Sequence, residues 1–124
     1  MIKQVLSDDI IKQYLPILTA CPLFNTLGIP ELTSYLHNAK VIIKNYKKND
    51  FIAISGDPME GIGVILEGSA LLTRENVLGQ RVIMANLEAS SIFGEALLFS
   101  KHPLWPATIK ALKPTKIMFI PLET

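Results

Sequence analysis

The sequence is poor in the side chains that form disulfides and bind metals. Its 124 residues include one cysteine, Cys21, and two histidines, His37 and His102. A single cysteine cannot form an internal disulfide, which is typical of proteins of a reducing compartment. The two histidines lack the spacing of zinc ligands, and one cysteine cannot hold an iron–sulfur cluster within the chain. We therefore expect no metal site and no cofactor, with haem binding through His102 as the remaining alternative.

The sequence also lacks an excess of charge of one sign and a long apolar run. The 12 Lys and Arg residues and 11 Asp and Glu residues give a formal net charge of +1 at pH 7. Nucleic-acid-binding domains have a basic face, so we expect DNA contacts only through a part of the protein outside this sequence. No apolar run approaches the roughly 20 residues that cross a membrane as a helix. These absences favour a cytoplasmic protein without membrane contact.

A nucleophilic active site is not indicated either. Ser90, Ser91 and Thr108 have no histidine and acid near them in the sequence that could activate a hydroxyl. We therefore expect no enzymatic activity and no catalytic residue.

Residues 1–39 form an expected helical lead-in. Apolar residues between positions 10 and 15 have helical spacing and follow two aspartates, which favour the positive end of a helix. Pro16 is expected to bend or interrupt this helix. Pro30 suits the first turn of a second helix. The buried face of the second helix is predicted from residues that repeat at three and four positions, namely Leu32, Tyr35, Leu36 and Ala39.

Residues 40–120 have the pattern of a β-protein. Short segments rich in β-branched and aromatic residues are separated by turn residues at intervals of roughly ten positions, which is typical of a sandwich or barrel. Gly79 can take a positive φ and closes an expected hairpin loop at 76–79. The predicted strands cover residues 41–46, 51–54, 62–66, 70–74, 81–87, 107–112 and 116–120.

The segment 89–112 contains the most informative local pattern. Gly94 allows a tight turn and a close approach to a ligand, and residues 95–99 have the composition of a short helix. The start of such a helix presents backbone N–H groups to an anion, and Glu95 there can pair with a hydroxyl or a cation. The alternative is that Gly94 only turns the chain and that the apolar residues after it only fill the core.

Residues 93–99, Phe-Gly-Glu-Ala-Leu-Leu-Phe, resemble the phosphate-binding cassette of cyclic-nucleotide-binding domains. Segments 49–51, 55–58 and 66–69 resemble the turn signatures of the same family in the same order. From about Cys21 onward the wider resemblance is to the sensor domain of the Crp/Fnr transcription regulators. It implies a mainly β fold, an antiparallel double-stranded β-helix (jelly roll) with flanking N-terminal helices, as a single domain over residues 1–124.

The resemblance also implies roles for individual residues. Phe93, Gly94, Glu95 and Ala96 would face the effector, with the backbone around a phosphate and Glu95 on a ribose hydroxyl. In nucleotide-binding relatives an arginine, then a small hydroxyl or alanine residue, neutralises the cyclic phosphate from the next strand. That signature falls on Trp105, Pro106 and Ala107.

The arginine of this signature is thus replaced by Trp105, and Pro106 supplies neither a hydroxyl nor a backbone donor. A phosphate in a partly buried site needs a paired cation or several donors. The only arginines, Arg74 and Arg81, are expected at a hairpin away from the cassette, and rescue by Lys110 is the less favoured alternative. We therefore expect that the effector is not cyclic AMP.

Two interpretations of Trp105 remain open. The indole could form a wall of an effector pocket for an apolar or aromatic ligand, or it could fill an obsolete pocket as core. The leading functional hypothesis is an effector-sensing domain of a transcription regulator. A ligand-free interaction module of the same fold and a small cupin-like enzyme are the alternatives, and two separated histidines argue against the enzyme.

In the Crp/Fnr family a long helix with the dimer interface follows the sensor domain, and a helix-turn-helix domain binds DNA after it. Residues 1–124 contain neither pattern, so we expect an excised sensor domain rather than a naturally short relative. The full-length protein is expected to be a homodimer that binds DNA through a C-terminal domain.

Overall fold

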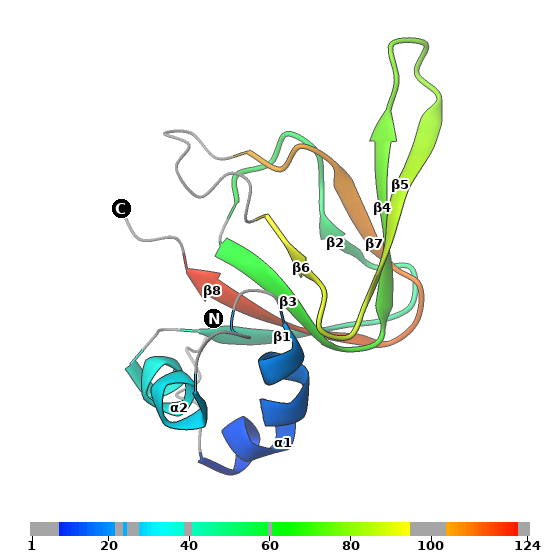
Figure 1. Cartoon of the computed structure of the whole chain (residues 1–124). Coiled ribbons are helices and arrows are strands. Elements are labelled where there is room, and N and C mark those ends of the chain that lie inside the picture. The colour runs from blue at the N-terminus through cyan, green and yellow to red at the C-terminus, as the bar shows by residue number, and fades with distance from the viewer. Residues whose placement is uncertain are drawn as a thin grey trace.

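The computed structural model describes residues 8–21, 24, 28–38, 41–59, 61–94 and 104–121. Two helices precede eight strands in this part of the chain, and Figure 1 shows both helices packed at one end, below the strands. The strands β4 and β5 extend as a hairpin away from the helices (Figure 1).

The eight strands form two four-stranded antiparallel sheets. The first sheet has the order β1-β8-β3-β6 and the second the order β2-β7-β4-β5. Most connections pass from one sheet to the other, so the mainly β jelly-roll architecture expected from the sequence is confirmed. The first sheet contains β1 (Ile42–Tyr46), β8 (Thr115–Pro121), β3 (Gly61–Glu67) and β6 (Ile92–Phe93), and the second contains β2 (Phe51–Ala53), β7 (Thr108–Ala111), β4 (Ser69–Glu75) and β5 (Arg81–Glu88).

The first sheet is buried on both faces. Alternate residues of β3 and β8 pack against the helices α1 (Asp8–Ala20) and α2 (Ile29–Asn38), among them Val64 and Met118. Their neighbours Ile65 and Ile117 join the second core cluster together with residues of the other sheet. Because side chains alternate between the faces of a strand, this double burial explains why the middle of β3 is apolar without a polar alternation.

A polar contact also joins the helices to the first sheet. The Lys116 ammonium donates a hydrogen bond of 2.9 Å to the Tyr14 hydroxyl, which donates one of 3.3 Å to the Glu67 carboxylate. The hydrogen bond to Tyr14, aided by the nearby Glu67 charge and opposed by partial burial, raises the pKa of Lys116 above its usual 10.5.

The helices differ from the expectation at two residues. Helix α1 continues past Pro16 to Ala20, so the predicted interruption at Pro16 is wrong. Leu18, beyond the proline, is fully buried, and this burial offsets the backbone hydrogen bond that a proline removes. In α2, Leu32 and Leu36 are buried as predicted, whereas Tyr35 is 42% exposed and Ala39 lies outside the described residues.

The three turn segments that resemble the family signatures each contain a residue with left-handed backbone. The φ angles are 75° at Asn49, 92° at Gly56 and 97° at Gly68. Gly79, in the predicted hairpin loop, has φ 78°. Glycine takes this conformation without a steric penalty, and asparagine is among the few other residues that adopt it, so these turns follow directly from the sequence.

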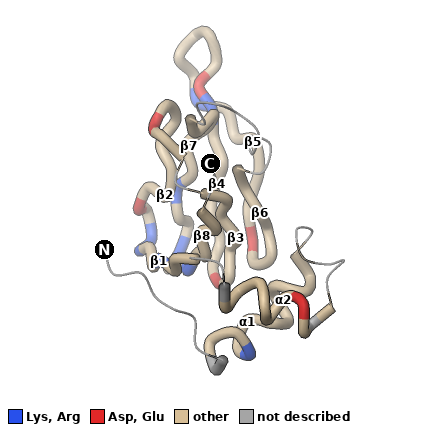
Figure 2. Tube along the Cα trace, turned by 90° about the vertical axis from the view of Figure 1, so that its left-hand side faces the viewer, with Lys and Arg blue, Asp and Glu red and all other residues tan. Residues whose placement is uncertain are grey.

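Charges of both signs are spread over the strands and meet at the hairpin. Figure 2 shows basic and acidic residues close together at the base of the hairpin loop, and in the strand register Glu75 lies opposite Arg81. Within the described ranges, no helix has the length and apolar character to cross a membrane.

Candidate functional site

The backbone of Trp105 is fixed to the turn that follows β2. Its N–H donates a hydrogen bond of 2.9 Å to the Asp57 carbonyl, and its carbonyl accepts one of 2.8 Å from the Gly56 N–H. The preceding residue, Leu104, forms an isolated antiparallel bridge with Pro58. The turn signature at 55–58 therefore determines where the segment after the cassette enters the barrel.

The indole of Trp105 lies inside the barrel. It is 6% exposed and packs on Phe93, with ring centroids 5.6 Å apart and planes inclined by 41°. Phe93 in turn meets Phe119 edge-on, with a centroid distance of 6.0 Å. The Phe93 ring lies over Gly63, where any Cβ would overlap it. Offset and edge-on contacts of this kind stabilise aromatic clusters, so Trp105 is held firmly at this position.

Gly94 lies directly against Trp105. Its φ is 91°, and a Cβ built on it would lie 2.8 Å from the Met59 Cε and 3.2 Å from the Trp105 Cζ3. The space beside the backbone at the start of the cassette is therefore already filled by two side chains.

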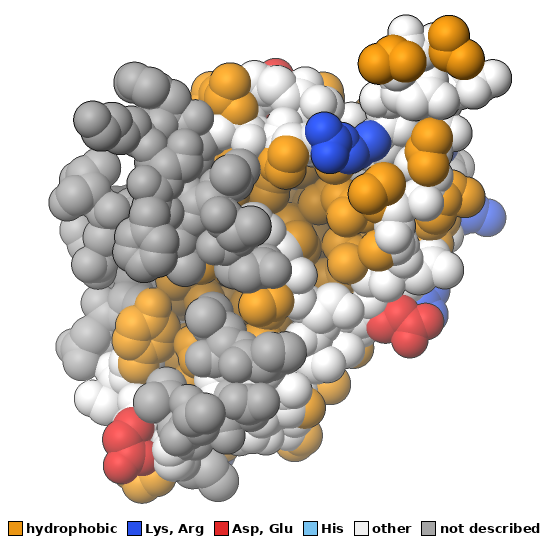
Figure 3. Space-filling view, turned by 45° about the horizontal axis from the view of Figure 1, so that its top comes forward, with side chains coloured by type: hydrophobic (Ala, Val, Ile, Leu, Met, Phe, Trp, Pro, Cys, Tyr) orange, Lys and Arg blue, Asp and Glu red, His pale blue; other side chains and the backbone are white. Residues whose placement is uncertain are grey.

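A first cavity, of about 260 Å³, opens beside Trp105 and is here named the Arg74 cavity. Its buried walls are apolar, and the exposed Arg74, Met84 and Pro106 border it. Figure 3 shows this face of the molecule hollowed and lined by hydrophobic side chains, with basic side chains at the rim near the hairpin. The described residues that line it are Leu72, Arg74, Met84, Leu87, Ile92, Phe93, Gly94, Trp105, Pro106, Ala107 and Ile109.

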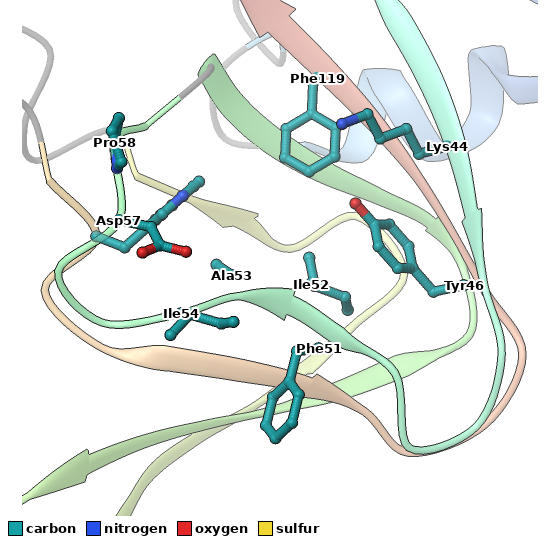
Figure 4. Close-up of a pocket in the computed structure, with 10 residues that line it drawn as sticks. Lys44, Tyr46, Phe51, Ile52, Ala53, Ile54, Asp57, Pro58 and Phe119 are labelled. Carbon is teal, nitrogen blue, oxygen red and sulfur yellow. The ribbon is translucent and has the colours of Figure 1, made fainter. Parts of the chain in front are cut away.

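A second cavity, of about 240 Å³, is here named the Asp57 cavity. Figure 4 shows Lys44 and Tyr46 from β1 and Phe119 from β8 on one side, opposite Asp57 and Pro58. The Lys44 ammonium is 5.5 Å from the centre of the Phe119 ring. Among the described residues, Trp105 alone lines both cavities, so its indole separates them.

A third, more polar depression of about 410 Å³, here named the polar pocket, lies next to the Arg74 cavity. It is lined by Arg81 and Glu75 and by hydroxyl side chains. Arg74 and Pro106 line both hollows, so Arg74 lies at the boundary between them.

Comparison with known families places the fold and this site in context. The profile of the cyclic nucleotide-binding domain matches residues 43–124. The chain belongs to the cyclic nucleotide-binding domain family. The matched range contains Gly94 and Trp105 and every described strand residue from Ile43 onward. No curated protein matches the chain in a sequence search.

Solved structures of this family share the fold. The N-terminal domain of a transcriptional regulator from Streptomyces coelicolor A3(2) is 27% identical, with a TM-score of 0.70 over 85% of this chain and 71% of that one. The sensor domain of the transcriptional regulator DNR from Pseudomonas aeruginosa is 22% identical, with a TM-score of 0.74 over 89% of this chain and 72% of that one. The resemblance inferred from the motifs is thereby confirmed.

A candidate cyclic nucleotide binding protein from Ruegeria pomeroyi is 20% identical, with a TM-score of 0.77 over 90% of this chain. The present chain spans only 48% of that protein. The comparison with that protein therefore applies to about half of its length.

Five of the seven predicted site residues meet in this cyclic nucleotide-binding domain. The Arg74 cavity is lined by Phe93 and Gly94 from the cassette start and by Trp105, Pro106 and Ala107 from the following segment. The other two, Glu95 and Ala96, lie outside the described residues, as does His102. The proximity of the five residues is a geometric fact, and their binding role stays a prediction.

Arg74 does not lie where the sequence predicted it. It was expected at a hairpin away from the cassette, yet it lines the same cavity as Gly94 and Trp105. The strand alternation contained this signal, since Ala70 and Leu72 belong to the core and Arg74 follows on the same face of β4. Lys110, in contrast, alternates with the lining residue Ile109 and does not line the cavity.

The described part of the chain contains no candidate metal site, because no group of three or more His, Cys, Asp and Glu side chains converges there. Every buried polar side-chain atom of the described residues has a hydrogen-bond partner.

Proposed function

We propose that this chain is the effector-sensing domain of a bacterial Crp/Fnr-type transcription regulator, and that its effector is a small molecule other than cyclic AMP. The observation that carries the second part is the packing of Trp105 against Gly94. The proposal treats residues 1–124 as one domain, with a helical lead-in at 1–39 and a β-roll at 40–120.

The exclusion of cyclic nucleotides has a steric and an electrostatic reason. Trp105 and Met59 fill the space beside Gly94, where the cassette backbone of relatives approaches the phosphate. Trp105 also stands where those relatives carry the phosphate-binding arginine, and Pro106 has no backbone donor. Loss of a charge-assisted bond to a buried anion costs about 3 kcal/mol, which is more than a hundredfold in affinity.

The Arg74 cavity supports the idea that a smaller effector replaces the nucleotide. Its apolar walls can bury the body of a ligand, and its volume of about 260 Å³ leaves room for one aromatic ring with a short substituent. Small-molecule sites are mostly apolar, have a few polar groups and measure roughly 300–1,000 Å³, so this smaller cavity suits a ligand smaller than a nucleotide.

The context of the domain is part of the same proposal. The full-length protein would be a cytoplasmic homodimer that contacts DNA through a separate C-terminal domain, and the sensor would have no catalytic activity. Effector binding would shift an equilibrium between two arrangements of the barrel and the dimer helix.

One observation favours a second candidate, a ligand-free interaction module. Trp105 is 6% exposed and belongs to the barrel core, as expected if it had simply filled an older pocket. The two candidates differ in whether any small molecule stabilises the fold.

Calorimetric titration with cyclic AMP and cyclic GMP tests the exclusion, and a low-micromolar dissociation constant for either nucleotide would refute it. A melting-temperature screen with nucleotides and small aromatic acids tests the effector site, because a ligand of the folded state raises the melting temperature. Trp105 is the only tryptophan, so its emission reports the cavity directly. A screen in which no compound shifts either signal would favour the ligand-free module.

A further inference from the structure

The Arg74 cavity has an uneven distribution of charge. Among the described residues that line it, Arg74 is the only charged one. Its side chain is exposed at the rim, while the walls, such as Phe93, Trp105 and Ile109, are buried. No described residue forms an ion pair with Arg74. Among the described residues no acidic side chain competes for Arg74, which lies at the boundary between the cavity and the polar pocket.

The strand pairing explains how Arg74 reaches this place. In the second sheet β4 lies antiparallel to β7, with Leu72 opposite Ile109 and Thr73 opposite Thr108. The next residue along β4 is thus level with Ala107, which follows Trp105 and Pro106. Arg74 approaches the Trp105 side of the cavity from a neighbouring strand, and not from the strand that carries the arginine in nucleotide-binding relatives.

We infer that Arg74 is the anion-binding residue of this cavity, and that the ligand is a small carboxylate whose apolar body lies in the cavity beside Trp105. This inference rests on the proposed effector-binding role of the domain. Arg74 would take the role that the phosphate-binding arginine has in nucleotide-binding relatives, but from a different place in the barrel.

The chemistry of the rim favours a single carboxylate. A guanidinium offers two parallel N–H donors that match the two oxygens of a carboxylate. The described residues of the buried walls carry no further charge, and on this basis a dianionic phosphate would be only partly neutralised there. Arg81, the other arginine, lines the polar pocket together with Glu75 but does not line the cavity.

Matched pairs of probes test the inference on the whole chain. Benzoate, phenylacetate and cinnamate are each titrated beside the corresponding amide, with Trp105 emission and calorimetry as the readouts. The wild-type protein is expected to bind at least one acid more tightly than its amide by about tenfold or more, the usual effect of one charge-assisted pair. Phenyl phosphate is added to the panel to distinguish a carboxylate from a phosphate.

Arg74→Gln is the test variant, and Arg81→Gln is the matched control. Both remove one positive charge from adjacent strands, but only Arg74 lines the cavity. In Arg74→Gln the preference for the acid over the amide is expected to disappear while the amide affinity is unchanged. In Arg81→Gln the preference is expected to remain, and unchanged melting temperatures in both variants would show that the fold is intact.

Three outcomes would overturn the inference in different ways. Equal binding of acids and amides, or equal loss in the two variants, would refute the role of Arg74 and leave an effector cavity in place. Failure of every probe to bind at millimolar concentration would refute the carboxylate site and the effector cavity together. Tighter binding of phenyl phosphate than of any carboxylate would refute the ligand class.

Discussion

Trp105 packs directly on Gly94 at the start of the cassette, with only 3.2 Å between the Trp105 Cζ3 and the position that a Gly94 Cβ would take. Two features of the sequence thus depend on each other. Gly94 leaves room for the indole, and the proposed exclusion of cyclic nucleotides rests on this contact.

Substitution of Gly94 by alanine is expected to destabilise the domain more than the same substitution at Gly79. Both residues have positive φ, 91° and 78°, so alanine is strained by about 1–2 kcal/mol at either position. Only at Gly94 does the new methyl group also meet Met59 and Trp105, and such overpacking adds about 1–3 kcal/mol. The free energy of unfolding from urea denaturation measures the difference. Equal losses in Gly94→Ala and Gly79→Ala would contradict the close packing at Gly94.

The double variant Trp105→Arg with Pro106→Ser is expected to gain affinity for cyclic AMP. It restores the Arg-Ser-Ala signature of nucleotide-binding relatives and removes the indole from the space beside Gly94. The added charge-assisted pair should improve binding by about tenfold to a hundredfold over wild type, measured by calorimetry. The control, Trp105→Met with Pro106→Ser, opens the same space without the charge. If both variants bind equally well, the missing arginine is not the cause of the exclusion.

Lys116 is expected to stabilise the fold up to alkaline pH and not beyond it. Its pKa is raised in the folded state, chiefly by the hydrogen bond to Tyr14. The protonated side chain therefore contributes fully below 10.5, and the contribution is lost as the pH rises through the folded pKa. The difference in unfolding free energy between wild type and Lys116→Met should shrink as the pH rises above 10.5. Lys113→Met, an exposed substitution near the start of the same strand, is the control for the loss of a surface lysine.

Residues 1–124 alone are expected to bind no DNA sequence specifically at physiological salt. The formal net charge is +1, and basic and acidic residues are interspersed over the described part of the chain. Favourable contacts to the phosphates of DNA require a set of lysines and arginines on one face. An electrophoretic shift with a sequence-specific operator would overturn this expectation, whereas weak retardation only at low salt would be consistent with it.

Much of the fold follows from local sequence patterns. Seven of the eight strands lie where β-branched and aromatic segments predicted them, because alternation and turn residues act within a few positions of each other. The bounds of the eighth strand, β6, could not be predicted from the sequence, because Ile92–Phe93 is only two residues long and this strand exists through its pairing with Val64 and Gly63 of β3. The continuation of α1 past Pro16 was not predicted, because burial of Leu18 against the sheet cannot be seen in the helix sequence alone.

The sequence by itself determined the family and placed the turn at Phe93 and Gly94, and it predicted that Trp105 replaces an arginine of the family, since motif identity and spacing need no coordinates. Only the tertiary structure decided where Trp105 and Arg74 lie relative to each other. Trp105 separates two cavities because the turn at 55–58 fixes its backbone, and Arg74 meets it because β4 pairs with β7. Both facts depend on contacts between segments more than thirty positions apart, for example Thr73 opposite Thr108, and the pairing of such segments is set by the packing of the whole barrel and not by any local pattern.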